Sequence, residues 1–224
     1  EISACLVGSE MCIRDRFIGE PIGAFMAALS SWLNGMQNSS KIILGIILGA
    51  MITFDMGGPL NKTAFFFAVA MIPTNPSLMA AVATAVCTPP LGLALATFMF
   101  KKKFTVAEQE SGKAALIMGC IGITEGAIPF AAADPVKVLP SIMVGGAAAS
   151  VTSLLLGPTS QAAWGGLIVL PVVTNKIGYL IAIAIGTVIT ALVVSALKKP
   201  VTEEVKVEES SNNDDLELDI TCLL

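Results

Sequence analysis

The sequence contains no histidine, and only 13% of its 224 residues are Asp, Glu, Lys or Arg. The lack of histidine excludes histidine-based acid–base chemistry and histidine metal sites. Basic residues are scattered among few aromatics, so we expect no nucleic-acid partner. We also expect no disulfide framework, metal or other cofactor, because none of the five cysteines has CxxC or metal-ligand spacing: Cys5, Cys12, Cys87, Cys120 and Cys222.

The sequence as a whole is strongly apolar, with 54% hydrophobic residues and a mean hydropathy of +0.80. Residues 177–197 carry no charge and are long enough to cross about 30 Å of hydrocarbon as a helix. Several other apolar segments are shorter and are interrupted by prolines, including Pro89, Pro90 and Pro140. We therefore predict an all-α, polytopic helical membrane protein. Its apolar segments are 22–36, 42–54, 63–73, 77–100, 114–133, 138–157, 160–175 and 177–197.

The charged residues divide the chain into three parts. Residues 1–16 have mixed charge and no helical pattern, so we expect them to be non-native or unstructured. Residues 17–200 are the predicted membrane domain. Residues 201–224 hold eight acidic groups and one lysine, a net charge of −7, which predicts a flexible acidic tail.

Two groups of lysines indicate the orientation of the chain. Lys101–Lys103 follow one apolar segment, and Lys198 and Lys199 follow the last. By the positive-inside rule both groups are cytoplasmic, and the tail with them. The polar segment 101–113 is predicted to be a short amphipathic or connecting helix.

Glu125 is the only charged residue between Lys113 and Asp134. An acidic side chain at the centre of a membrane helix costs about 2.5–3.5 kcal/mol, so residues kept there usually bind a substrate, an ion or a proton. Gly122, Gly126 and Pro129 break the helix around it. We expect Glu125, with Thr124 beside it, to accept hydrogen bonds from substrate hydroxyls; a structural carboxylate at a helix terminus is the alternative.

Segments 114–133 and 160–175 are short and broken by glycine and proline, as in re-entrant hairpins. A pair of such segments is a good sequence indicator of a transporter binding site. The second contains Gln161, which offers an amide, and Trp164, which offers a flat face for a sugar ring. Trp164 as an interfacial anchor is the alternative.

Two further groups are candidates for the same site. Asp55 and Lys62 flank a Gly-Gly-Pro turn that we place at the membrane boundary, either as a structural ion pair or, through Asp55 and Asn61, as part of the substrate path. Asp134 precedes Pro135, a pattern typical of a helix N-cap. A cap next to the pocket can also contact substrate.

Three runs resemble the membrane subunit, enzyme IIC, of bacterial sugar phosphotransferase systems of the fructose/mannitol branch. They are GITEGAIPFAAADP (122–135), FDMGGPLNKTAF (54–65) and PPLGLALATFMFKKKFT (89–105). The resemblance covers residues 17–199 and implies a homodimeric, multi-pass permease in the bacterial inner membrane, in contact with lipid. It also implies a fructose-like substrate, phosphorylated during transport by a phosphocysteine on a separate enzyme IIB module.

The same resemblance implies that Glu125 is the catalytic residue, which orients or partly deprotonates a sugar hydroxyl while Thr124 and Gln161 fix the ring. Fructose-type members carry Pro-His-Gly-Gly where this chain has Ala163-Trp164-Gly165-Gly166, so mannose or a mannosyl derivative stays open. Helices expected upstream of Phe17 are absent, so we expect the C-terminal part of the subunit. An ion-coupled secondary sugar transporter and a truncated, non-transporting fragment remain alternatives.

Overall fold

The computed structural model describes residues 28, 31–32, 35 and 41–198. The predicted segments 1–16 and 201–224 lie outside the described residues, as does most of the apolar segment 22–36. The described residues form helices and no strands, which confirms the all-α fold class. The α-helices are α3 (Lys41–Phe54), α4 (Pro59–Ala70), α5 (Pro76–Met99), α6 (Val106–Ile121), α7 (Ile128–Ala133), α8 (Pro135–Leu156) and α9 (Lys176–Leu197), and the 3-10 helices are η2 (Lys101–Lys103), η3 (Thr124–Ala127) and η4 (Leu167–Val169).

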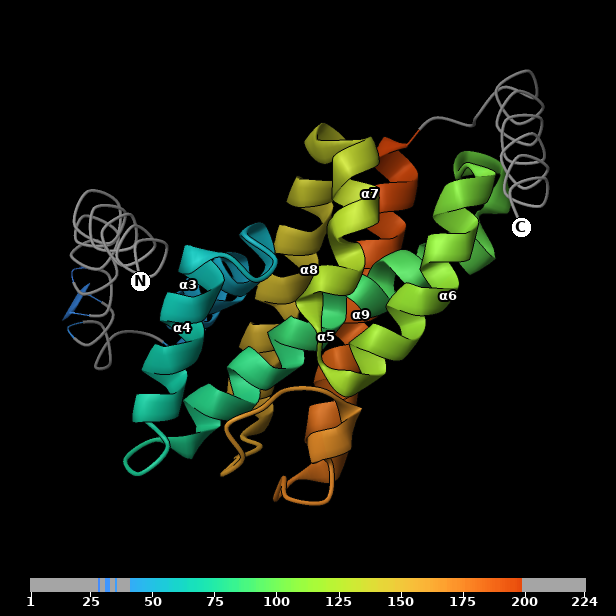
Figure 1. Ribbon diagram of the computed structural model, residues 1–224. Coiled ribbons are helices and arrows are strands. Elements are labelled where there is room, and N and C mark those ends of the chain that lie inside the picture. Colours follow the sequence, from blue (N-terminus) through green and yellow to red (C-terminus); the bar gives the residue numbers. More distant parts are fainter. Residues whose placement is uncertain (1–27, 29–30, 33–34, 36–40, 199–224) are drawn as a thin grey trace, which may run out of the picture.

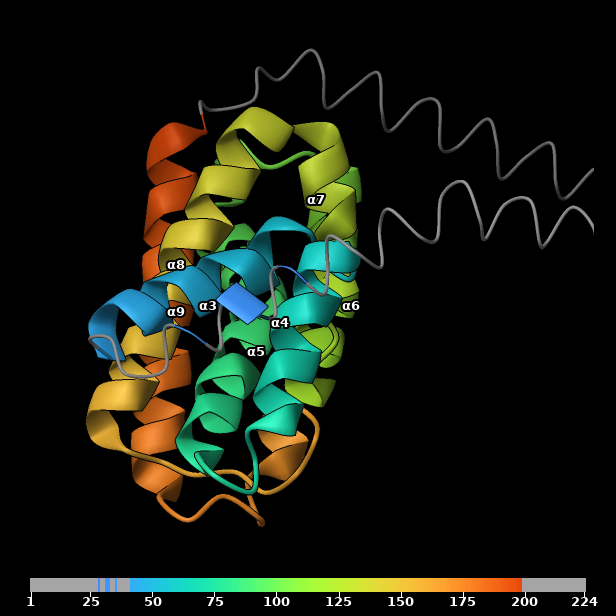
Figure 2. The same ribbon diagram turned by 90° about the vertical axis from the view of Figure 1, so that its left-hand side faces the viewer.

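Helix α5 lies at the centre of the bundle and packs against α3, α4, α6, α8 and α9 (Figure 1, Figure 2). Among the described residues α5, α8 and α9 are long and apolar enough to span a membrane, and the most apolar stretch of α5 is 94% buried inside the protein. Pro89 and Pro90, which we expected to interrupt this segment, lie inside α5, as Pro140 lies inside α8. Each proline removes one backbone hydrogen bond, and packing against neighbouring helices holds the helix together across the gap.

Glycines bring α8 close to both α3 and α9. A Cβ atom on Gly145 would lie 2.9 Å from the carbonyl oxygen of Gly186, and one on Gly146 would lie 3.0 Å from that of Gly49. Small residues at such crossings let helix backbones meet and gain van der Waals contact. Thr53, near the end of α3, also contacts Gly146 in the middle of α8. The α3–α4 turn therefore lies about halfway along α8, and its placement at the membrane boundary stays a prediction.

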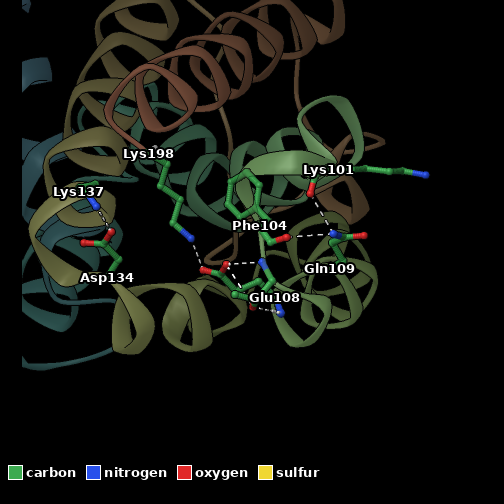
Figure 3. Close-up of polar contacts among 8 residues, drawn as sticks. Lys101, Phe104, Glu108, Gln109, Asp134, Lys137 and Lys198 are labelled. Atoms are coloured by element: carbon green, nitrogen blue, oxygen red, sulfur yellow. Dashed lines mark hydrogen bonds and ion pairs between the residues drawn. The ribbon is translucent and has the colours of Figure 1, made fainter. Parts of the chain in front are cut away.

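Both described lysine groups lie at one end of the bundle. The Nζ of Lys103 donates a hydrogen bond of 2.5 Å to the carbonyl oxygen of Ser195. Lys198 forms a buried ion pair with Glu108, and its ammonium lies 4.5 Å from the centroid of the Phe104 ring (Figure 3). The lysines thus share one side, as a common orientation requires; that this side is cytoplasmic stays a prediction.

The segment 101–113 is not a separate connecting helix. It consists of η2 followed by the first half of α6. Thr105 caps α6 by accepting a hydrogen bond from the backbone N–H of Glu108 (3.3 Å), and the Glu108 carboxylate accepts one from the N–H of Thr105 (3.0 Å). This capping box starts a helix that continues into the apolar segment that follows.

Helices α6 and α7 form a helical hairpin, and its re-entrant position in a membrane stays a prediction. Helix α6 starts at the lysine end and stops at Gly122, whose φ of +92° is the left-handed conformation that ends a helix. After η3, helix α7 runs back, and the ring of Phe130 meets that of Phe104 edge-on at a centroid distance of 6.4 Å. The chain therefore leaves and returns to the same end of the bundle.

A second hairpin, residues 157–175, enters from the opposite end, where the orange segment of Figure 1 lies away from α7. Its base is closed by the N–H of Thr174, which donates to the carbonyl oxygen of Thr159 at 3.1 Å. Apart from η4 the segment is not helical. The two segments predicted as hairpins thus approach each other from opposite ends.

Candidate functional site

Three breaks in the helical bundle surround one cavity of about 260 Å³. They are the start of α4 after the α3–α4 turn, the reversal of the first hairpin and the tip of the second. Helix α5 contributes Val86, whose carbonyl oxygen has lost its usual helical donor because Pro90 has no N–H. The cavity is lined by Asn61, Lys62, Phe65, Val86, Gly122, Ile123, Thr124, Glu125, Trp164 and Gly165.

Glu125 lies in η3, between the two arms of the first hairpin. Its Oε2 accepts a hydrogen bond of 3.3 Å from the hydroxyl of Thr124, and its Oε1 faces Gly57 of the α3–α4 turn. A Cβ atom on residue 57 would lie 2.5 Å from that oxygen, and Gly57 has φ +109°. Only glycine fits both conditions. The Glu125 side chain is exposed rather than sheltered, because the cavity is open on one side.

The polar side chains of the α3–α4 turn and the start of α4 make different contacts. Asp55 accepts a hydrogen bond of 3.0 Å from the backbone N–H of Leu60, which caps α4. The amide nitrogen of Asn61 donates to the carbonyl oxygen of Ile52 at 2.6 Å and so anchors α4 to α3. Lys62 lines the cavity, and among the described residues the ion pair that we considered between Asp55 and Lys62 does not form.

The tips of the two hairpins touch through the side chain of Trp164 and through backbone atoms. The indole N–H of Trp164 donates to the carbonyl oxygen of Ile121 at 2.9 Å, and a Cβ atom on Gly122 would lie 2.8 Å from the backbone nitrogen of Gly166. The buried hydroxyl of Tyr179 donates to the carbonyl oxygen of Gly166 at 3.0 Å. Trp164, 49% exposed, thus both holds the tips together and presents a face to the cavity.

The structure brings together Glu125, Thr124, Asn61 and Trp164 of the predicted site, and it leaves three candidates outside the cavity wall. Asp55 is turned to the start of α4. Gln161 is exposed on the arm of the second hairpin, before its tip. Asp134 pairs with Lys137 at 2.6 Å near the lysine end (Figure 3), where it precedes α8 without forming a side-chain cap.

Sequence reasoning missed several residues that build the site. Gly57 carries a recognisable signal, since glycine next to a helix terminus often marks a left-handed conformation. Tyr179 is the single tyrosine of the chain, and a buried tyrosine hydroxyl needs a partner. No local signal identifies Phe65 or Val86 as cavity residues.

The cavity wall offers an acceptor at Glu125, a hydroxyl at Thr124 and a flat aromatic face at Trp164, with the cation of Lys62 beside them. This mixture suits a small polyhydroxylated ligand better than an apolar one. Within the described residues no three Cys, Asp or Glu side chains gather closely enough to hold a metal ion.

Known proteins that are similar to this chain are named as fructose-type transport components. Over 203 residues, 90% of this chain and 56% of the relative, it is 49% identical to the "Fructose-like permease IIC component 2" of Escherichia coli K12. It is 42% identical to the "Fructose permease IIC component" of Bacillus amyloliquefaciens, over 84% of this chain and 62% of that protein. The chain is a homologue of the fructose-type permease IIC components.

A third relative, from Rhodobacter capsulatus, is named "PTS system fructose-specific EIIB'BC component" and is 47% identical over 84% of this chain and 33% of its own length. The chain thus spans between about a third and three fifths of these relatives. No family model and no solved structure matches it. The homologues and the apolar helices together assign it to the membrane proteins of bacteria.

Proposed function

We propose that the chain is the substrate-binding part of a sugar permease of a phosphotransferase system, which binds a fructose-like sugar and translocates it as it is phosphorylated. One observation carries the proposal. Glu125, Thr124, Asn61 and Trp164 line a single cavity at the meeting point of two hairpin tips, inside a bundle of apolar helices. The printed names of the relatives supply the sugar class.

The size and lining of the cavity support a monosaccharide. At about 260 Å³ it is smaller than the roughly 300–1,000 Å³ of pockets for drug-sized ligands. A sugar ring stacked on Trp164 would direct its hydroxyls to the carboxylate of Glu125 and the hydroxyl of Thr124.

The proposed reaction transfers a phosphoryl group from a phosphocysteine to a sugar hydroxyl. The hydroxyl oxygen attacks phosphorus, the S–P bond breaks, an O–P bond forms, and the cysteine leaves as a thiolate. Glu125 orients the hydroxyl and takes its proton, which is the catalytic role that we assign to it. Catalysis of this kind consists mainly of positioning and charge stabilisation.

The phosphocysteine is proposed to belong to an enzyme IIB module, in line with the EIIB'BC name of a relative. The homodimer, the contact with lipid and the cytoplasmic position of the tail stay predictions. The exposed apolar side chains on α9, among them Leu180, Ile181 and Leu192, are compatible with either lipid or a second copy of the chain.

Uptake into membrane vesicles tests the proposal. Vesicles containing the full chain would receive labelled fructose or mannose outside and a phosphorylated IIB partner inside, and the internal product would be separated by charge. Labelled sugar phosphate that depends on the partner supports the proposal. Unmodified sugar that accumulates with a proton or sodium gradient indicates a secondary transporter instead, and no uptake of either sugar indicates a non-transporting fragment.

A further inference from the structure

Lys62 and Glu125 place opposite charges in the wall of the same cavity without neutralising each other. Among the described residues the ion pairs within 4.0 Å are Asp134–Lys137 and Glu108–Lys198. The ammonium of Lys62 and the carboxylate of Glu125 are therefore farther apart than an ion pair, although both residues line one space of about 260 Å³. A ligand between them can contact both.

The acidic residue nearest to Lys62 along the chain is already engaged. Asp55 accepts the backbone N–H of Leu60, and its carboxylate packs against Gly58. It therefore compensates the start of α4 instead of the lysine. Lys62 is an exposed residue that lines the cavity, and no acidic side chain among the described residues pairs with it.

The backbone around Lys62 is firmly held. The N–H of Lys62 donates to the carbonyl oxygen of Gly58 at 3.0 Å, in the first turn of the 12-residue helix α4. Its neighbour Asn61 is 5% exposed and anchored to Ile52. Lys62 thus belongs to the N-terminal turns of α4, where the positive end of the helix dipole also favours an anion.

A neutral sugar gives no reason for a cation in this wall, whereas a phosphate ester does. We propose that Lys62 binds the phosphoryl group of the sugar phosphate, so that the cavity has a hydroxyl-orienting side at Glu125 and an anion-binding side at Lys62. This inference rests on the proposed function. Lys62 forms and breaks no covalent bond; its ammonium donates hydrogen bonds to phosphoryl oxygens and offsets their charge during transfer.

A competition binding experiment distinguishes the anion-binding side at Lys62 from the hydroxyl-orienting side at Glu125. Equilibrium binding of labelled fructose to the purified full chain would be measured alone and with unlabelled fructose 1-phosphate or fructose 6-phosphate as competitor. In the unmodified protein we expect at least one ester to compete. In Lys62→Gln we expect fructose binding to stay within about twofold and ester affinity to fall about tenfold or more, the effect of one lost charge-assisted hydrogen bond.

Lys62→Arg keeps the charge and should retain most of the ester affinity. Lys113→Gln, at an exposed lysine that lines a different cavity, is the matched control and should change neither affinity. Lys62→Arg also covers the case in which Lys62→Gln does not fold.

Several results would overturn the inference. Equal loss of fructose and ester binding in Lys62→Gln would make Lys62 a general sugar contact. Unchanged ester competition in Lys62→Gln would remove the anion site and leave the proposed function standing. The same conclusion would follow if neither ester competed in the unmodified protein while fructose bound. Failure of the unmodified protein to bind fructose or mannose would overturn both proposals.

Discussion

Trp164 donates its indole N–H to the carbonyl oxygen of Ile121 at 2.9 Å, and this bond joins the tip of the second hairpin to the reversal of the first. The two residues are 43 positions apart in the sequence and approach from opposite ends of the bundle. The cavity exists because this contact brings Trp164 to the wall that carries Thr124 and Glu125.

Trp164→Phe keeps an aromatic face and removes the hydrogen bond. One such bond contributes about 0.5–1.5 kcal/mol, so we expect sugar affinity to fall by roughly threefold to tenfold. Trp164→Ala also removes the stacking face and should lower affinity further. Trp32→Phe is a control, since Trp32 does not line the cavity. Equilibrium binding of labelled fructose measures all three, and unchanged affinity in Trp164→Ala would contradict the role given to this side chain.

Gly57→Ala should abolish sugar binding and uptake. A Cβ atom there would displace the Glu125 carboxylate, and alanine is also disfavoured at φ +109°. Gly157→Ala is a matched control, because Gly157 has φ +70° but a Cβ atom on it would meet no other atom within 4 Å. It should cost about 1–2 kcal/mol of stability and retain binding. Equal binding by the two variants would show that the Gly57–Glu125 contact is unimportant.

Tyr179→Phe removes the hydroxyl that donates to Gly166. The carbonyl oxygen of Gly166 would then keep only the longer hydrogen bond from the backbone N–H of Val169 (3.4 Å), and losing the shorter one should cost about 0.5–1.5 kcal/mol. We expect a lower melting temperature in detergent and weaker sugar binding, because the second tip loses its support. A variant as stable as the unmodified protein, with full affinity, would contradict this.

The ion pair between Glu108 and Lys198 is almost completely buried, with residue exposures of 5% and 8%. Glu108→Gln and Lys198→Met each leave one buried charge unpaired and should destabilise the protein by about 3–5 kcal/mol. Glutamine can still form the capping box with Thr105, and methionine can still pack on Phe104. The double variant should recover much of the loss. Thermal unfolding of the four proteins measures the coupling, and strictly additive losses would argue against the pair.

The sequence identifies the parts of this site whose signals are local. Glu125 stands out because it is a lone carboxylate in an apolar segment, and the two hairpins stand out because glycine and proline break them. The ends of α6 are equally local, since Thr105 and Glu108 have capping-box spacing and Gly122 follows the last turn. Our interpretation of 101–113 as a short amphipathic or connecting helix did not use that cap, which starts the longer helix α6 at Val106.

The parts that sequence reasoning missed depend on contacts between distant segments. Gly57 and Glu125 lie far apart in the sequence, and nothing near either residue indicates that they meet. The interpretation of Asp55 and Lys62 as an ion pair failed because the backbone N–H of Leu60 competes for the carboxylate. Pro89 and Pro90 were expected to break a helix that tertiary packing keeps intact.

The most direct test of the account changes Glu125 to glutamine, which keeps the shape and removes the charge. Glu110→Gln is the control, because Glu110 is an exposed glutamate on α6 outside this cavity. Partner-dependent formation of sugar phosphate in vesicles would be measured for both at equal amounts of folded protein. We predict that Glu125→Gln loses about a hundredfold or more of the rate, the usual contribution of an acid–base group, while Glu110→Gln keeps it. Sugar phosphate formation by Glu125→Gln at the rate of the unmodified protein would contradict the account.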